Sequence, residues 1–147
     1  MSSAQGLNAE DAEGTQKTQK NSRIENDVSS EIIDAAVEVQ RELGVGLLES
    51  AYAAALMLEL GTRGLPFRAE VPIAATYKGR PLGVAYRADL IVADSVIVEI
   101  KACEALTPDH RAQLLSYLRL AELKLGLLVN FNAFPVAKAV QRVVNKL

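Results

Sequence analysis

One stretch of the sequence decides the expected fold: Val84-Ala-Tyr-Arg-Ala-Asp-Leu-Ile-Val-Ala-Asp-Ser-Val-Ile-Val-Glu-Ile-Lys101. It consists of two runs rich in β-branched residues around a short turn, a pattern that predicts a β-hairpin. If Val92 pairs with Val96, Asp89 faces Glu99 across the ladder. Because side chains alternate along a strand, Lys101 then projects from the same face. An even-numbered loop would instead put the two acids on opposite faces.

Two neighbouring carboxylates repel each other unless a cation is present, so this pairing suggests a divalent-metal site with a lysine beside it. The alternatives are an exposed cross-strand pair, or simple ion pairs of Asp89 with Lys101 and of Glu99 with Arg87. The run around Glu99 is otherwise apolar, so its face is expected near the interior. Buried charges require partners or a metal, which favours the site.

Length and composition indicate a single domain with an aliphatic core, since half of the 147 residues are apolar and none is Trp. No apolar run approaches the roughly 20 residues of a membrane-spanning helix, and the N-terminus lacks a secretory signal pattern. The single cysteine, Cys103, excludes a disulfide framework and fits a reducing compartment. We therefore expect a cytoplasmic protein that does not bind membranes.

The charge is nearly balanced, with 16 Lys and Arg against 18 Asp and Glu. This balance argues against a broad electrostatic attraction to nucleic acid, although a local one is compatible with it. Five bases in the middle of the chain either contact phosphates or are solvated surface charges, and composition alone favours the second interpretation: Arg63, Arg68, Lys78, Arg80 and Arg87.

The order of elements predicts a small mixed sheet flanked by helices. Residues 1–27 have little apolar content and are expected to be disordered, which leaves 28–147 as the folded domain. Apolar residues at helical spacing predict helices over 29–43 and 47–63, and Thr-Pro-Asp at the start of 107–121 predicts a third.

Alternating residues over 67–77 predict a half-buried strand in which Pro72 marks an edge. The apolar run 125–131 predicts a strand buried on both faces, and 136–144 fits either a short helix or an edge strand. Since a helix follows the hairpin, the fourth strand is expected to run parallel to the third. The predicted fold class is therefore α/β.

Further polar residues lie where they could reach the hairpin. Glu49 precedes Tyr52 by one helical turn, and His110, Gln113 and Tyr117 share one face of the third helix. Each has a structural alternative: a solvated acid for Glu49, a helix cap or surface residue for His110, and hydrogen-bonding at the edge of the core for Gln113 and Tyr117. The chain has no glycine-rich phosphate loop, Cys/His zinc cluster or Gly-x-Ser-x-Gly motif. Metal-dependent phosphoester hydrolysis needs only acids and a base, which are present.

Asp89 followed by Glu99-Ile-Lys101 resembles the motif of the PD-(D/E)XK nuclease superfamily. Gly46-Leu-Leu-Glu-Ser-Ala-Tyr52 reads as G-x-x-E-x-x-Y and resembles the GxxExxY branch of that superfamily. The resemblance covers about residues 28–145. Four further stretches are also similar to that branch: Tyr86-Arg-Ala-Asp-Leu90, Val96-Ile-Val-Glu-Ile-Lys-Ala102, Ala112-Gln-Leu-Leu-Ser-Tyr-Leu118 and Leu125-Gly-Leu-Leu-Val-Asn-Phe-Asn132.

The resemblance implies a restriction-endonuclease-like core: a helix, a three-strand antiparallel meander, a crossover helix and a strand. It implies a Mg²⁺ site, with Mn²⁺ as a substitute, held by these groups: Asp89, Glu99, Glu49 and the backbone carbonyl of Ile100. Lys101 would orient the attacking water. Gln113 and Tyr117 resemble a Gln-x-x-x-Tyr pair of some branches. We also expect three residues to support the site: Tyr52, Arg87 and His110.

We therefore expect a Mg²⁺-dependent nuclease, with DNA a better candidate substrate than RNA. The alternative is a catalytically silent module that binds nucleic acid or protein. Because the domain is small and neutral, a homodimer or a protein partner is compatible with either function. The sequence departs from the family pattern at Ala88, in place of proline, and at Gln40 and Val45, in place of a histidine and a proline. A lost histidine would argue against acid/base chemistry from that helix but leaves the Asp–Glu–Lys set intact.

Overall fold

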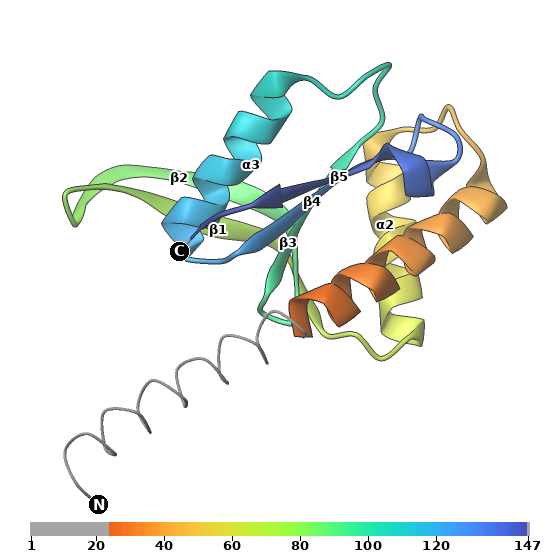
Figure 1. Cartoon of the computed structure of the whole chain (residues 1–147), viewed down its shortest axis with the longest axis horizontal. Helices are drawn as coiled ribbons and strands as arrows, with labels where there is room; N and C mark the ends of the chain where they lie inside the picture. Colours follow the sequence, from red (N-terminus) through yellow and green to blue (C-terminus); the bar gives the residue numbers. More distant parts are fainter. Residues whose placement is uncertain (1–23, 147) are drawn as a thin grey trace, which may run out of the picture.

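The computed structural model describes residues 24–146, which form three layers: a five-stranded sheet between two groups of helices (Figure 1). The N-terminal helix, residues 24–43, and α2 (Glu49–Thr62) cover one face of the sheet. The other face is covered by α3 (Pro108–Ala121). The mixed α/β fold flanked by helices is confirmed, as is the predicted start of α3 after Thr107.

The strands follow the order β1-β2-β3-β4-β5 across the sheet. Their bounds are β1 (Phe67–Tyr77), β2 (Arg80–Val92), β3 (Val96–Lys101), β4 (Leu125–Asn130) and β5 (Val140–Val144). β3 and β4 are parallel, as the crossover by α3 predicted, and the other neighbours are antiparallel. Pro72 lies in the edge strand β1, where a missing N–H is tolerated. The ambiguous segment contains both predicted forms, a 3-10 turn η1 (Val136–Ala139) and then β5.

The N-terminal helix begins earlier than predicted. Residues 24–27 are helical, and Ser29 lies inside the helix, where its hydroxyl donates to the Asn26 carbonyl at 2.9 Å instead of capping the start. The guanidinium of Arg142, from β5, donates to Ser29 Oγ and Asn26 Oδ1 at 2.9 Å each. These tertiary contacts stabilise a polar turn that composition alone assigned to a disordered tail. The remainder of that predicted tail, residues 1–23, lies outside the described residues.

Each face of the sheet has its own hydrophobic core. The N-terminal helix and α2 contribute residues such as Ile32 and Leu56, which pack on side chains of β3 and β4. On the opposite face, Leu114 and Leu118 of α3 pack on Ile97 and Leu128. The central strands are therefore buried on both sides, as their continuous apolar sequences predicted. No helix in the described part of the chain is long and apolar enough to cross a membrane.

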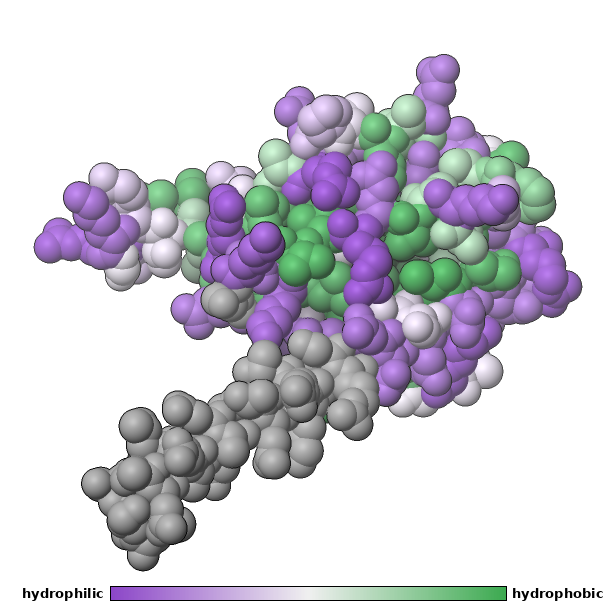
Figure 2. Space-filling view, in the orientation of Figure 1, coloured by the Kyte–Doolittle hydropathy of each residue, from purple (hydrophilic) through white to green (hydrophobic). Residues whose placement is uncertain are grey.

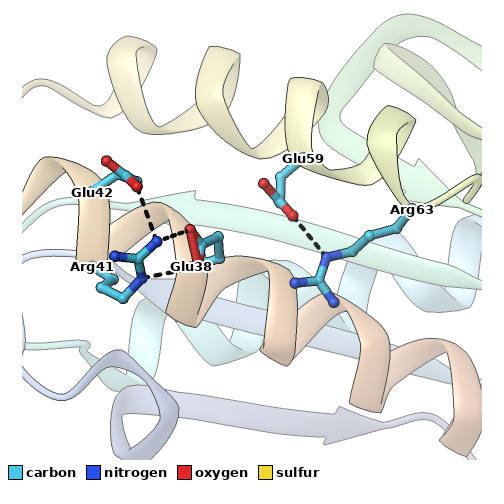
Figure 3. A network of polar contacts seen from close by, with 5 residues as sticks. All are labelled: Glu38, Arg41, Glu42, Glu59 and Arg63. Atoms are coloured by element: carbon cyan, nitrogen blue, oxygen red, sulfur yellow. Dashed lines mark hydrogen bonds and ion pairs between the residues drawn. The ribbon is translucent and has the colours of Figure 1, made fainter.

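The outer surface of the helical pair carries short-range ion pairs. Arg41 pairs with Glu38 and Glu42, and Arg63 pairs with Glu59 one turn earlier in α2 (Figure 3). Exposed pairs of this kind contribute little to stability, on the order of 0–1 kcal/mol each. The fold therefore depends on its two cores rather than on this surface network.

A buried glutamine joins the helical layer to the end of the sheet. The side-chain amide of Gln40 donates to the carbonyls of Phe131 and Ala133, at 3.0 and 2.8 Å, and its oxygen accepts from the Val136 N–H at 2.8 Å. All polar atoms of this side chain are thus used in holding the loop after β4. Gln40 is thus a structural connector between the N-terminal helix and this loop.

At Gly126, β4 packs closely against Leu114 of α3. A Cβ at this position would lie 2.8 Å from Leu114, which is fully buried. We predict that Gly126→Ala lowers the free energy of unfolding by about 1–3 kcal/mol, the cost of overpacking a core, measured by urea denaturation.

The matched control is Gly61→Ala. Gly61 lies in α2, and a Cβ there would meet no atom within 4 Å. This change is expected to be neutral or to stabilise by up to about 1 kcal/mol, because alanine favours the helix. Equal effects at both positions would contradict the packing explanation.

Candidate active site

The hairpin of β2 and β3 has the predicted register. Val92 pairs with Val96, and the ladder continues to Leu90 opposite Val98, where it ends. β3 nevertheless continues beside β4 as far as Lys101, which pairs with Asn130. β2 therefore separates from β3 at this point, and we call the opening between them the strand fork.

At the strand fork, each acid binds the backbone of the opposite strand. The Asp89 N–H donates to Glu99 Oε2 at 2.7 Å, and the Ile100 N–H donates to Asp89 Oδ2 at 2.8 Å. Backbone donors that lose their ladder partners need others when they are buried. The two carboxylates accept hydrogen bonds from these donors, and the two reciprocal bonds hold the carboxylates side by side. Within the described residues, no hydrogen bond reaches the second oxygen of either carboxylate, so both remain available to a ligand.

The alternation of side chains between the two faces of the sheet is interrupted in β2 at Asp89. Ala88 belongs to the core under α3, whereas Leu90 belongs to the core under the helical pair, although strict alternation would put both on the same face. In β1, Glu70 lies between the partners of these two residues and has a φ of +49°, which is unusual for a residue with a side chain. This local irregularity places half-buried Asp89 at the edge of both cores.

A cavity of about 360 Å³ lies beside the fork, with walls from α2, β1, β2 and β3. Glu49, Glu70, Asp89 and Ile100 are among its lining residues. Glu49 opens the first turn of α2 and is exposed. Among residues 24–146, no three His, Cys, Asp or Glu side chains are arranged to hold a metal ion together. The structure thus brings Asp89 and Glu99 together, while Glu49 shares their cavity without joining a three-ligand group.

The two central acids have raised pKa values. Burial raises the pKa of Glu99 to about 7, with a further contribution from the charge of Asp89. Burial is also the main reason that the pKa of Asp89 is raised. Lys101 is partly buried and its charge lowers both pKa values, but it forms no ion pair with any carboxylate of the described residues. The site therefore has a deficit of positive charge, which a divalent cation would offset.

A family model for the PD-(D/E)XK nuclease superfamily matches residues 26–143, which is most of the chain. The chain belongs to this superfamily. Comparison with curated proteins gave no match, and comparison with solved structures gave none either. Members of the PD-(D/E)XK superfamily are nucleases that act on nucleic acids and generally use divalent metal ions.

Two residues of α3 that the sequence predicted for the site differ in their exposure and contacts. Tyr117 is buried, its ring lies 5.7 Å from that of Tyr86, and its pKa is raised by burial and then by the charges of Glu99 and Asp89. The charges of the two acids therefore act on Tyr117. Gln113 is exposed one turn earlier on the same helix.

His110 is a helix cap, which is the structural alternative that the sequence left open. Its ring Nδ1 accepts from the backbone N–H of Thr107 at 3.1 Å, and the backbone N–H of His110 donates to Thr107 Oγ1 at 3.3 Å. These two bonds form a reciprocal capping box at the start of α3. The histidine ring nitrogen that could act as a base is occupied by this bond.

Tyr52 and Arg87 have structural contacts away from the two central acids. The Tyr52 hydroxyl donates to the Gly44 carbonyl at 2.7 Å and accepts from the Leu47 N–H at 3.2 Å, and its ring stacks on Phe131. Tyr52 thus fixes the loop before α2. Arg87 is exposed and lies 3.7 Å from Glu70. It does not pair with Glu99, which was one of the alternatives for the hairpin.

Sequence reasoning missed three residues that shape this site. The alternating pattern of its strand placed Glu70 on the outward face, because the irregular backbone at this position has no signal in the sequence. Tyr86 could have been found from its place in the segment Tyr86-Arg-Ala-Asp. Asn130 could have been found as the polar residue in an apolar strand: it is buried, and its side chain accepts from the Cys103 N–H and donates to the Cys103 carbonyl. It thereby fixes the chain that follows Lys101.

The raised pKa of Glu99 predicts a pH-dependent stability of the metal-free protein. A carboxyl with a folded-state pKa of about 7 and an ordinary value of 4.5 binds a proton more tightly when folded. The free energy of unfolding should therefore fall as pH rises from about 4.5 to 7, by roughly 1–3 kcal/mol, and Asp89 acts in the same direction. Glu99→Gln keeps an oxygen for the Asp89 N–H, should flatten this slope and should be more stable than the wild type at pH 8.

The measurement is chemical denaturation in chelator between pH 4.5 and 8. Glu104→Gln is the matched control, since Glu104 is exposed on the segment between β3 and α3. It should keep the wild-type slope. An unchanged slope in Glu99→Gln would show that this carboxyl is not the titrating group.

Proposed function

We propose that the protein is a divalent-metal-dependent nuclease that hydrolyses phosphodiester bonds, in DNA in preference to RNA. One observation carries the proposal: Asp89 and Glu99 lie side by side at the strand fork, each with an oxygen not used by the described residues. Lys101 follows on the same strand, in a chain of the PD-(D/E)XK superfamily.

The donor set fits Mg²⁺. Carboxylate and carbonyl oxygens are the ligands that this hard cation prefers, and Mn²⁺ accepts the same donors. We assign Asp89, Glu99 and the backbone carbonyl of Ile100 as ligands. Glu49 would add a carboxylate from the α2 wall of the cavity. When bound, such an ion would polarise the phosphate and lower the pKa of a coordinated water.

Lys101 is assigned to the attacking water and the charge of the reacting phosphate. Because its ammonium group has no carboxylate partner at contact distance in the described residues, it is available to the substrate. A cation at this position stabilises the negative charge that develops as the phosphodiester is attacked. Tyr117, whose ring lies 5.7 Å from that of Tyr86, would position the substrate. Gln113, which is exposed one turn before Tyr117 on α3, would assist from the same helix.

The contacts around α2 support assignment to the GxxExxY branch, because Gly46, Glu49 and Tyr52 each occupy a position that suits their residue type. Gly46 has a φ of +97°, which only glycine adopts readily. The Tyr52 hydroxyl fixes the loop through Gly44 and Leu47. Between them, Glu49 begins the helix beside the cavity. The motif thus places one carboxylate beside the cavity, at the start of a helix whose preceding loop is held by Tyr52.

The second candidate function is a catalytically silent module that binds nucleic acid or protein. It is favoured by the absence of a three-ligand group within residues 24–146. Metal binding distinguishes the two, since a silent site need not retain it. A homodimer or a protein partner would serve either function by enlarging the binding surface. Cys103 is a free thiol, which supports a cytoplasmic location.

We predict that the purified protein cleaves DNA in Mg²⁺ or Mn²⁺ and that Asp89→Ala and Lys101→Ala each lower the rate by about 100-fold or more. The first change removes a metal ligand, and the second removes the cation that stabilises the transition state. Cleavage of labelled DNA and RNA substrates on denaturing gels measures both rates. Activity that survives Asp89→Ala would contradict the assignment of the site.

Calorimetric titration with Mn²⁺ provides a second readout that does not require turnover. The wild-type protein should bind the ion, Glu99→Ala should lose binding, and Glu104→Gln, on the exposed segment after β3, should retain both binding and cleavage. If the wild-type protein binds no metal, the silent module is the better interpretation.

A further inference from the structure

β1 and β2 continue together well beyond the end of β3. From Val71 opposite Ala88 to Tyr77 opposite Arg80, they form a two-stranded ribbon, residues 71–88, that we call the β1–β2 arm. Eight residues of β2 in extended conformation span about 26 Å. α3 covers the root of the arm, where Val71 and Ile73 are buried, and the tip projects away from the three layers (Figure 1).

The arm carries positive charge and no acidic residue. Its charged residues are Lys78, Arg80 and Arg87. At the root, Arg87 lies near Glu70, but at the tip no carboxylate of the described residues pairs with Lys78 or Arg80. The Lys78 ammonium lies 5.5 Å from the centre of the Tyr77 ring. The space-filling view shows hydrophilic residues gathered at the tip (Figure 2).

Three other surface arginines are neutralised, whereas exposed Arg111 and Arg119 have no carboxylate partner among the described residues. Arg41, Arg63 and Arg68 each form an ion pair with a nearby carboxylate. A solvated surface charge gains little from such a pair, so an unpaired cation would not by itself indicate a function. Two unpaired cations at the end of a projecting ribbon are different, because the ribbon extends them to where a large polyanion can reach both.

The strand fork needs such a contact. Four acids lie at or beside it: Glu49, Glu70, Asp89 and Glu99. Without a metal these four acids repel a polyanionic substrate, and Lys101 and Arg87 are the two basic residues that oppose their charge at the fork. The tip lies about 26 Å from the fork along the ribbon, beyond the screening length of about 8 Å at physiological salt. The tip cations therefore cannot attract substrate to the fork through the electric field alone, and must bind the same substrate molecule at a distance from the fork.

We propose that the β1–β2 arm binds duplex DNA along its major groove, with Lys78 and Arg80 contacting phosphates away from the reacting bond. This inference rests on the proposed function, since it assigns part of the substrate to a surface outside the site. A major groove about 12 Å wide admits a two-stranded ribbon. The major groove of A-form RNA is too narrow for one. The shape of the arm thus selects DNA.

The apolar side chains of the arm agree with this contact. Leu82, Val84 and Tyr86 are each about half exposed. Apolar side chains in the major groove contact thymine methyl groups. A second protein chain is the competing occupant for these side chains, but it would leave the two tip cations unexplained. Charge complementarity therefore favours DNA.

The test is DNA binding in chelator, which prevents metal-dependent cleavage. Fluorescence anisotropy with a labelled 20-base-pair duplex measures the observed binding constant over a range of salt concentrations. In the double variant Lys78→Gln/Arg80→Gln, the slope of log K against log salt should become less steep by about 1.8, or 0.9 for each lost phosphate contact. Its affinity should fall about tenfold at low salt, and an RNA duplex of the same sequence should bind more weakly and be insensitive to the two changes.

The matched control is Lys124→Gln/Lys146→Gln, which removes the same charge. Lys124 precedes β4, at the end of the sheet opposite Lys101, and shares a surface pocket with Lys146. This variant should keep the wild-type slope. Thermal unfolding and light scattering confirm that each variant is folded and report its oligomeric state.

Three outcomes would overturn the proposal: an unchanged slope in the arm variant, an equal change in the control, or an equal effect on duplex RNA. An arm variant that alters oligomeric state but not the slope would identify a protein interface instead. The proposed nuclease activity fails separately, because the binding test requires no metal. If neither the wild-type protein nor any variant cleaves DNA but the salt dependence changes as expected, DNA binding by the arm is supported and the catalytic assignment is wrong.

Discussion

Two backbone N–H groups without ladder partners set the geometry of this protein. Where β2 turns away from β3, the amides of Asp89 and Ile100 would be left unbonded, and the carboxylates of Glu99 and Asp89 accept from them. The acids are therefore positioned by the backbone rather than by each other, against their mutual repulsion. The same separation releases the β1–β2 arm from the sheet, so the site and the arm are two consequences of one divergence of strands.

This arrangement is unfavourable in itself, and the remainder of the fold has to compensate for it. Glu99 is almost fully buried and its charge is opposed by that of Asp89, which is why its pKa is raised. The two hydrophobic cores on either side of the sheet supply the opposing stability, and polar connectors such as Gln40 and Asn130 hold the loops around the fork. Strongly shifted pKa values of this kind cluster at functional sites.

The regular parts of this fold could be predicted because they follow local rules. Alternation and turn residues predicted the hairpin and its register, and Thr107 with the following proline predicted the start of α3. The irregular parts could not be predicted in this way. The left-handed backbone at Glu70 and the change of face at Asp89 interrupt two strands without altering their composition.

Residue type alone left the contacts of two polar side chains open. Tyr52 was expected to support the site because of its motif, and His110 was expected either there or as a helix cap. In the folded chain, Tyr52 holds the loop before α2 and His110 caps α3. Their roles depend on which backbone groups lie within reach, and that is a property of the folded chain.

The link between Gln40 and the loop after β4 has a consequence for how the protein is made. This side chain bonds to residues more than 90 positions later in the chain, and the parallel partner of β3 is likewise synthesised late. During synthesis the chain therefore contains both acids and the lysine well before it contains the elements that hold them in place. A nascent chain therefore holds Asp89, Glu99 and Lys101 before the partner strand of β3 and the loop partners of Gln40 exist, so the strand fork forms only after residue 136 has been synthesised.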